Sequence, residues 1–467
     1  MKRLLASGAF TLLALAAILW HQAQSGSEAK ESQKLNVLFI AVDDLRPELG
    51  CYGNSLIQTP NIDRLASQGT RFDLAYCQYP LCNPSRTSLF TGRHPTTTGV
   101  MDNRKWFRAE HPDFVTLPQH FKANGYASLR TGKQFHGGID DTDAWTEGGE
   151  ARNFTGAANT AAPGQNPANS DRIIKLQGDG ETHGDYRSAT RAIEYLEKYK
   201  DRPFFLALGF AKPHSPPTAP QKMFDLYDAG KMPLPPDFAA SPKAPEGFPA
   251  ISIPTRNSDL FIGRDASEAE AREVIRAYYA SISFVDYNVG RVLAALDRLK
   301  LRDKTIVVFW GDHGYHLGEK GKWSKANSLY EVGTRVPLII VSPNGPPNGK
   351  AQMTRATVQL LDMYPTLVEM CGLPQPSGLQ GHSLTPLLKN PKAKWKHPAF
   401  TVTYFQNKLG KAVRNDRWRY AEWEDGKSGA MLFDHSKDPR ELKNLADDPA
   451  HAKVVAEMKT LLAKMPR

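Results

Sequence analysis

Three continuous apolar runs constrain the fold of this chain more than any other feature of its sequence. They are Asn36–Val42, Pro203–Phe210 and Thr305–Trp310; all three contain aromatic residues, and the first and third also contain β-branched residues. Runs without polar alternation are typical of strands buried on both faces, as in a parallel sheet. Segments with helical spacing lie between them, so the sequence predicts an α/β fold with a large, mostly parallel sheet sandwiched by helices.

Polar side chains follow the predicted strands at the points where the strands end. Asp43 and Asp44 follow the first run, Lys133 and His136 follow a predicted strand at 126–130, Lys212 and His214 follow the second run, and Asp312 and His313 follow the third, with Lys325 soon after. The carboxyl ends of parallel strands meet at one edge of a sheet, where α/β proteins bind ligands. Each cluster alone could be a turn, but together they predict one site.

The segment from Cys82 to Arg93 predicts a helix with a cysteine at its start. Pro84 suits the first turn of a helix, where its missing N–H costs nothing. Arg86 adds a fixed positive charge nearby. A thiol beside a helix N-terminus and an arginine is expected to be unusually acidic and reactive. The alternative interpretation is a buried structural cysteine beside a helix cap.

The first residues predict a secretory signal peptide over 1–26. Lys2 and Arg3 precede an apolar run from Leu4 to Trp20, and small polar residues follow. The alternative is a permanent N-terminal anchor. Export would place the protein in the periplasm or outside the cell, or in a lysosome-like compartment of a eukaryote, with no stable membrane partner.

Charge and cysteine content exclude several classes of protein. The 467 residues carry 59 Lys and Arg against 49 Asp and Glu, a net charge of +10, without a dense basic run. This bias fits an acidic substrate better than nucleic acid. Four cysteines are too few for a disulfide scaffold, and Cys51 with Cys77 could be paired or free.

The motif Cys82-x-Pro-Ser-Arg86 with Thr-Gly-Arg93 resembles the signature of type I sulfatases of the alkaline phosphatase superfamily. Within that family the chain is most similar to the iduronate-2-sulfatase-like branch. The similar features are Asp43-Asp44, Gly-Lys133-x-x-His136, Lys-Pro-His214, Gly-Asp312-His313-Gly and Trp-x-Lys325. The resemblance covers residues 34 to 450. It implies a catalytic domain at 34–390 and a small C-terminal α+β subdomain at 391–467. In that subdomain, strands at 418–423 and 430–434 precede a helix near 452–464.

The resemblance also implies the catalytic groups. A formylglycine-generating enzyme would oxidise Cys82 to an aldehyde, whose hydrate attacks sulfur while Asp312 accepts its proton. One Ca²⁺ would be held by Asp43, Asp44, Asp312, His313 and the oxidised Cys82. The catalytic shell would be Arg86, Lys133, His136, His214 and Lys325, with His214 or Lys325 protonating the leaving alcohol. His313 stands where many sulfatases have asparagine, and histidine is an atypical calcium ligand.

The expected function is therefore a secreted sulfatase acting on sugars of sulfated, uronate-containing polysaccharides. The Lys133–His136 spacing is one residue longer than in arylsulfatases, which argues against a simple aryl ester. Two long irregular segments, 137–182 and 215–254, could wall an extended cleft. The alternatives are a phosphate or phosphonate monoester hydrolase or a choline sulfatase of the same superfamily and, in a different class, a non-enzymatic protein that binds sulfated glycans.

Overall fold

The computed structural model describes residues 34–150, 171–343, 345–346 and 349–466. The predicted signal peptide at 1–26 lies outside these residues, as does part of the irregular segment 137–182. Asn36–Arg467 forms one compact unit. The boundary predicted between residues 390 and 391 stays a prediction. Among the described residues, no helix combines the length and the apolar character that a membrane span requires.

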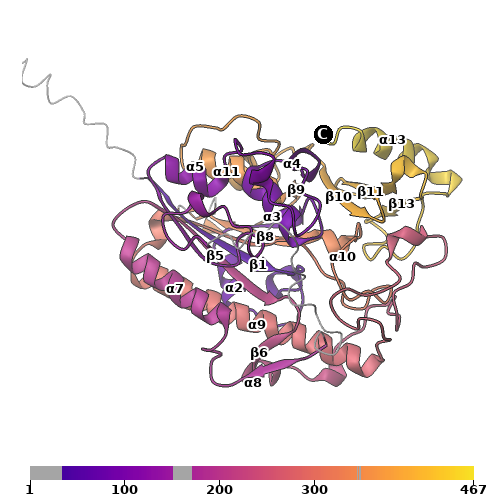
Figure 1. The fold of residues 1–467 in the computed structure, drawn as a ribbon, viewed down its shortest axis with the longest axis horizontal. Helices are drawn as coiled ribbons and strands as arrows, with labels where there is room; N and C mark the ends of the chain where they lie inside the picture. Colours follow the sequence, from indigo (N-terminus) through magenta and orange to yellow (C-terminus); the bar gives the residue numbers. More distant parts are fainter. Residues whose placement is uncertain (1–33, 151–170, 344, 347–348, 467) are drawn as a thin grey trace, which may run out of the picture. The chain divides into compact units, whose positions relative to one another are not determined.

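The core of the molecule is a sheet that lies between layers of helices (Figure 1). It has seven strands, in the order β3-β5-β1-β7-β8-β2-β9. Its strands are β1 (Asn36–Asp43), β2 (Thr70–Tyr76), β3 (Ala127–Gly132), β5 (Phe204–Pro213), β7 (Thr305–Gly311), β8 (Arg335–Val341) and β9 (Gln352–Gln359). Only β8 runs against the others. The predicted mostly parallel sheet is confirmed, and the three apolar runs form its adjacent strands β5, β1 and β7. Strands β2 and β9 were not predicted, because neither is a continuous apolar run.

Helices cover both faces of this sheet. The helices are α2 (Pro60–Ala66), α3 (Cys82–Thr91), α4 (Pro95–Thr98), α5 (Leu117–Ala123), α7 (Gly184–Tyr199), α8 (Gln221–Phe224), α9 (Glu268–Arg298), α10 (Glu331–Thr334), α11 (Met363–Met370), α12 (Thr385–Lys389) and α13 (Ala452–Leu462). Alternate residues of β1 point to opposite faces. Leu38 and Ile40 join a core with α2, α7 and α9. Phe39 packs instead against Phe90 of α3.

The long helix α9 begins at a capping box. Ser267 and Glu270 form a capping box, in which the Ser267 side chain accepts from the Glu270 amide and the Glu270 side chain accepts from the Ser267 amide. Nineteen of its residues are buried, among them Tyr278 and Phe284. The helix therefore forms the largest single part of the core on its side of the sheet.

A second, four-stranded antiparallel sheet lies near the C-terminus, in the order β10 (Ala399–Phe405), β11 (Lys408–Arg414), β12 (Trp418–Trp423) and β13 (Ala430–Asp434). Met458 and Leu462 of α13 pack on one of its faces. On the other face, Trp423 and Phe433 contact Tyr330 of the main body. The predicted strands at 418–423 and 430–434 and the terminal helix are confirmed, whereas β10 and β11 were not predicted. A third, two-stranded sheet pairs β4 (Ile174–Leu176) with β6 (Thr218–Pro220).

Candidate active site

The register of the parallel strands brings the predicted polar clusters to one edge of the sheet. Val42 of β1 pairs with Gly311 of β7, and Asp43 pairs with Pro213 of β5. On the far side of β5, Gly132 of β3 pairs with Gly209. The residues that follow these positions therefore emerge together, because four neighbouring parallel strands end at the same level. The predicted convergence of the clusters is confirmed.

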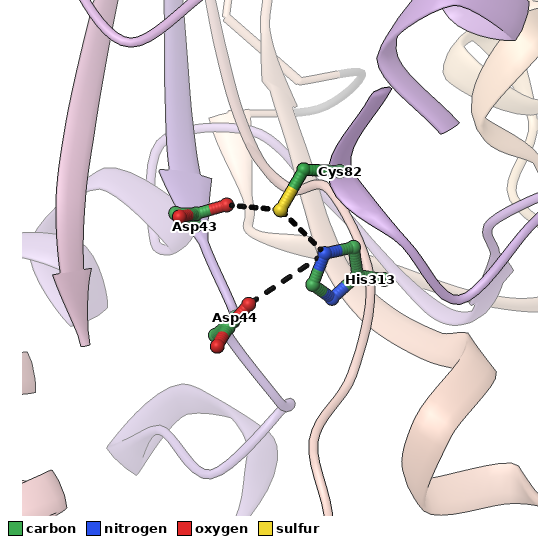
Figure 2. Close-up of side chains that lie close together, drawn as sticks. All are labelled: Asp43, Asp44, Cys82 and His313. Atoms are coloured by element: carbon green, nitrogen blue, oxygen red, sulfur yellow. Dashed lines mark hydrogen bonds and ion pairs between the residues drawn. The ribbon is translucent and has the colours of Figure 1, made fainter. Parts of the chain in front are cut away.

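Cys82 is the first residue of α3 and its thiol lies in the centre of this edge (Figure 2). Its Sγ atom is 3.3 Å from Oδ1 of Asp43 and 3.3 Å from Nε2 of His313. The same His313 nitrogen is 3.5 Å from Oδ1 of Asp44. All four side chains are buried. Residues from three separate parts of the sequence thus surround one point.

The prediction of an acidic thiol is wrong. Burial raises the pKa of Cys82 well above its usual value, and the negative charge of Asp43 raises it further. Lys133 and Lys325 oppose this shift without reversing it. The helix N-terminus is present as expected, but desolvation of the thiolate outweighs it. Cys82 is consequently a poor thiolate nucleophile in this environment.

Arg86, one turn after Cys82 in α3, links the groups at this edge of the sheet. Its Nε atom donates to Oδ2 of Asp312 at 2.8 Å, and its Nη2 atom lies 3.4 Å from Oδ1 of Asp43. Its Nη1 atom donates to the carbonyl oxygens of Lys133 and Gln134 at 2.8 and 2.9 Å. The guanidinium is fully buried. It therefore joins the ends of β1, β3 and β7 through one side chain.

Two lysines flank the thiol and the carboxylates. Nζ of Lys133 pairs with Oδ2 of Asp43 and lies 3.6 Å from Sγ of Cys82. Nζ of Lys325 lies 3.0 Å from Oδ2 of Asp44 and 3.3 Å from Oδ2 of Asp259. Burial would lower the pKa of Lys325, but Asp259 and Asp44 outweigh it and hold that pKa well above its usual value. Lys325 therefore carries its proton in this environment.

The two predicted histidines are held differently. The Nδ1 atom of His136 is buried without a hydrogen-bond partner, and burial with the charge of Lys133 lowers the pKa of His136 to about 3. Nδ1 of His214 lies 2.7 Å from the carbonyl oxygen of Ser215. Lys212 Nζ donates to the carbonyl of His214 at 2.6 Å and so braces this turn. Burial lowers the pKa of His214, against the charge of Asp44. Burial thus disfavours the charged form of both imidazole rings.

Sequence reasoning missed two residues that support the site. Asp259 lies in an irregular stretch with no strand before it, so nothing in the sequence marks it as a partner of Lys325. Tyr278 lies among the core residues of α9, where its spacing indicates packing alone. Its hydroxyl donates to the carbonyl of Asp44 at 2.7 Å and accepts from the amide of Arg46 at 3.1 Å. These bonds hold Asp44 in its left-handed conformation, with φ of 59°.

The donor set fits a divalent cation. Asp43, Asp44, Cys82 and His313 each offer one atom, and these atoms lie within 4.8 Å of one another. Oδ1 of Asp44 is buried and accepts no hydrogen bond, so one carboxylate oxygen remains available. Carboxylate oxygens suit Ca²⁺ or Mg²⁺, whereas a thiol sulfur does not. Asp312, the remaining predicted ligand, stands just outside this group, since its Oδ2 atom is 3.5 Å from His313 Nε2 and pairs with Arg86.

Comparison with known proteins identifies the family. Residues 35–373 match the model of the sulfatase family. Residues 318–467 match a model described as N-sulphoglucosamine sulphohydrolase, C-terminal. The first match spans well over half of the chain and contains the whole cluster around Cys82.

Individual relatives agree with this assignment. The chain is 36% identical to a sulfatase of Formosa agariphila, over 97% of this chain and 91% of the relative. It is 35% identical to the iduronate 2-sulfatase of Homo sapiens, over 76% of this chain and 71% of the relative. A solved structure of a 2-O GAG sulfatase superposes with a TM-score of 0.69 at 27% identity, covering 92% of this chain and 91% of that one. The chain therefore belongs to the sulfatase family, enzymes that hydrolyse sulfate esters.

Proposed function

We propose that this protein is an exported, formylglycine-dependent sulfatase that removes sulfate from sugars of uronate-containing polysaccharides. The observation that carries the proposal is the position of Cys82, which is buried between two carboxylates, a histidine and Lys133. The similarity to human iduronate 2-sulfatase and to a 2-O GAG sulfatase supports a sugar sulfate as the substrate. Export rests on the apolar segment within residues 1–26.

The environment of Cys82 favours its oxidation to formylglycine. An unmodified thiol would be a soft donor among hard oxygen ligands, and burial raises its pKa, so little thiolate would form. An aldehyde hydrate at this position would supply oxygen both as a ligand and as a nucleophile. The motif from Cys82 to Arg86 would be the substrate of a formylglycine-generating enzyme, which is the maturation partner that we propose.

Asp43, Asp44, Asp312 and His313, together with the oxidised Cys82, would hold one Ca²⁺. When bound, this cation would stabilise negative charge that develops on the oxygens of the sulfuryl group. Arg86, fully buried, keeps the carboxylates at fixed positions. The ammonium group of Lys133 adds a positive charge beside the position that the nucleophile would occupy.

The charges of the site favour a sulfate ester over a phosphate ester. The ion-paired groups comprise four carboxylates (Asp43, Asp44, Asp259 and Asp312) and three cations (Arg86, Lys133 and Lys325). These seven groups together therefore carry a net charge of −1. A divalent cation would change it to one positive charge, which complements the single negative charge of a sulfate monoester. A phosphate monoester carries about −1.5 to −2 at pH 7 and would be less well neutralised.

The remaining side chains would move protons. Asp312 lies 3.5 Å from His313 and close to the thiol, where it could accept the proton of the nucleophile. His214 or Lys325 would protonate the leaving oxygen of the sugar. His136, whose Nδ1 atom has no hydrogen-bond partner, is free to contact a sulfate oxygen. These roles share one edge of the sheet, so substrate would approach from the ends of β1, β3, β5 and β7.

The first experiment tests maturation and turnover together. The protein is produced with and without a formylglycine-generating enzyme, and the peptide containing Cys82 is analysed by mass spectrometry. We expect the aldehyde form only in the first preparation, and activity in proportion to it. Cys82→Ala is the control, and should fold normally without turnover. Full activity from a preparation with only reduced Cys82 would contradict the proposal.

A second experiment tests the substrate. Catalytic efficiency is compared across sulfated uronate oligosaccharides, an activated aryl sulfate, choline sulfate and a matched phosphate ester. We expect the uronate oligosaccharides to be the best substrates. A preference for choline sulfate or the aryl ester would refute the glycan assignment alone, and a preference for the phosphate ester would refute sulfatase specificity. Tight glycan binding without any turnover would instead indicate a binding protein.

A further inference from the structure

A stretch of the chain outside the active site carries only positive charge. Residues 370–415 contain seven lysines and arginines and no aspartate or glutamate. Three of the seven are neutralised by neighbouring carboxylates: Lys408 pairs with Glu424, Lys411 with Asp425, and Arg414 with Glu331. The other four are Lys389, Lys392, Lys394 and Lys396. Within the described residues, none of these four forms an ion pair.

The four lysines are exposed to solvent along one segment. They lie between the end of α12 and the start of β10. From residue 392 to 396 exposure alternates, since Lys392, Lys394 and Lys396 are exposed whereas Ala393 and Trp395 are partly buried. Residues 391–393 form a turn, in which the Ala393 amide donates to the carbonyl of Asn390 at 2.8 Å. The three lysines therefore lie exposed within five residues of one another and close to Lys389 in the chain.

Aromatic rings lie next to these lysines in the chain. Nε1 of Trp395 donates to the carbonyl of Thr357 at 2.8 Å, which fixes the segment to β9, an edge strand of the main sheet. The ring of His397 stacks on that of His382 with centroids 3.6 Å apart, and Trp395 packs edge-on to His397 at 4.8 Å. Both imidazoles are exposed. The lysines thus lie beside a group of three packed rings, those of His382, Trp395 and His397.

We propose that His382 and residues 389–397, here called the basic segment, form a second polysaccharide-binding site that anchors the sulfated polymer while the active site removes a sulfate. The lysines would bind sulfate or carboxylate groups, and the rings would pack against the apolar faces of sugar units. This inference rests on the proposed function, because it assumes that the substrate is a polymer with charges beyond the one that is cleaved.

Several features favour this occupant over other polyanions. A sugar polymer presents separated charges with C–H faces between them, which matches lysines alternating with partly buried side chains and bordered by rings. Isolated exposed lysines bind a single small anion weakly, whereas a group of four neighbouring lysines binds a polyanion through several contacts at once. The described part of the segment exposes no large aliphatic side chain that could insert into a lipid bilayer.

The test uses two variants with the same change in net charge. In the first, Lys389, Lys392, Lys394 and Lys396 are all changed to glutamine. In the control, the same change is made at Lys437, Lys443, Lys453 and Lys464, four exposed lysines outside the basic segment that form no ion pair within the described residues. Binding to immobilised heparin is measured at low and high salt, with unsulfated hyaluronan, single-stranded DNA and phosphatidylglycerol vesicles as comparison ligands.

We expect the first variant to bind heparin at least tenfold more weakly at low salt, and the control to change less than twofold. On a sulfated disaccharide both variants should keep wild-type kcat/KM, whereas on the polymer the first variant should show a raised KM with unchanged kcat. Equal losses in both variants would overturn the inference, as would stronger binding to DNA or vesicles than to heparin. If the first variant bound the polymer as the wild type does and turned over the disaccharide normally, the role of the basic segment would be refuted and the proposed function would stand. If the wild type turned over no sulfate ester, the proposed function itself would be refuted.

Discussion

The Nε atom of Arg86 lies 2.8 Å from Oδ2 of Asp312, and both side chains are fully buried. This pair joins α3, whose first residue is Cys82, to the segment that directly follows β7 and contains His313. Asp312 also accepts hydrogen bonds from the amides of Asp44 and His313, at 3.1 and 3.0 Å. A single buried ion pair therefore sets the relative positions of the groups around Cys82.

Replacing Arg86 by leucine is expected to destabilise the protein by about 3–5 kcal/mol, because it leaves the buried carboxylates of Asp43 and Asp312 without their partner. The measurement is the free energy of unfolding from urea denaturation at pH 7. Arg64→Leu, at an exposed position of α2, is the control and should change stability by less than about 0.5 kcal/mol. Similar stability of the two variants would show that the pair has no structural role.

Removal of divalent cations is expected to lower both activity and melting temperature. Without a cation, the ion-paired groups of the site carry one excess negative charge in a buried environment, which is unfavourable. Differential scanning fluorimetry and turnover would be measured after chelation and after addition of Ca²⁺ or Mg²⁺. We expect Ca²⁺ to restore both quantities. Asp44→Asn should lose this response, and an unchanged melting temperature of the wild type after thorough chelation would contradict the proposed metal site.

Asp259→Asn is expected to lower kcat/KM about tenfold, which corresponds to about 1.4 kcal/mol of transition-state stabilisation. Asp259 lies 3.3 Å from the ammonium group of Lys325 and shares it with Asp44. Its loss would leave Lys325 less firmly oriented. Lys325→Met should cost more, about 100-fold or greater. If Asp259→Asn had wild-type kinetics, the position of Lys325 would depend on Asp44 alone.

The leaving-group dependence of variants at His214 and Lys325 is expected to identify the proton donor. An alcohol leaving group needs a proton in the transition state, whereas an activated phenol leaves without one. The variant that lacks the donor should therefore lose far more activity on a sugar sulfate than on an activated aryl sulfate. The other variant should lose a similar factor on both. Equal losses on both substrates for both variants would mean that neither residue protonates the leaving oxygen.

Glu331→Gln is expected to destabilise the protein by about 3–5 kcal/mol at pH 7, with a loss that shrinks in acid. Burial would raise the pKa of Glu331, but His435, Arg419 and Arg414 outweigh it and hold that pKa well below its usual value of 4.5. The Nη2 atom of Arg419, on β12, lies 2.6 Å from Oε2 of Glu331. The carboxylate thus connects the C-terminal sheet to α10.

The sign of this pH effect follows from the lowered pKa. A carboxylate whose pKa is lower in the folded state contributes its full stability above the unfolded value, here 4.5, and loses it progressively as the pH falls below that value. The difference in unfolding free energy between the wild type and Glu331→Gln should therefore be constant from pH 6 to 8 and decrease below about pH 4.5. Glu457→Gln, exposed on α13, is the control and should show no such trend.

The sequence by itself determined which polar residues would meet at one edge of the sheet. The buried strands were recognisable as continuous apolar runs, and parallel strands must end at a common edge, so Asp43, Lys133, His214 and Asp312 could be placed together without coordinates. The cysteine at the start of α3 was equally predictable, because Pro84 and the following residues suit a first helical turn. These features depend on neighbours in the chain or on a general rule of sheet topology.

The tertiary structure alone decided the electrostatics of the site. The sequence indicated an acidic thiol at Cys82, but complete burial beside Asp43 raises its pKa instead. Asp259 and Tyr278 reach the site from segments whose sequences give no sign of it, and the pairing of Arg419 with Glu331 spans 88 residues. Desolvation and long-range ion pairs depend on which side chains exclude water from one another, and that is settled only when distant parts of the chain pack together.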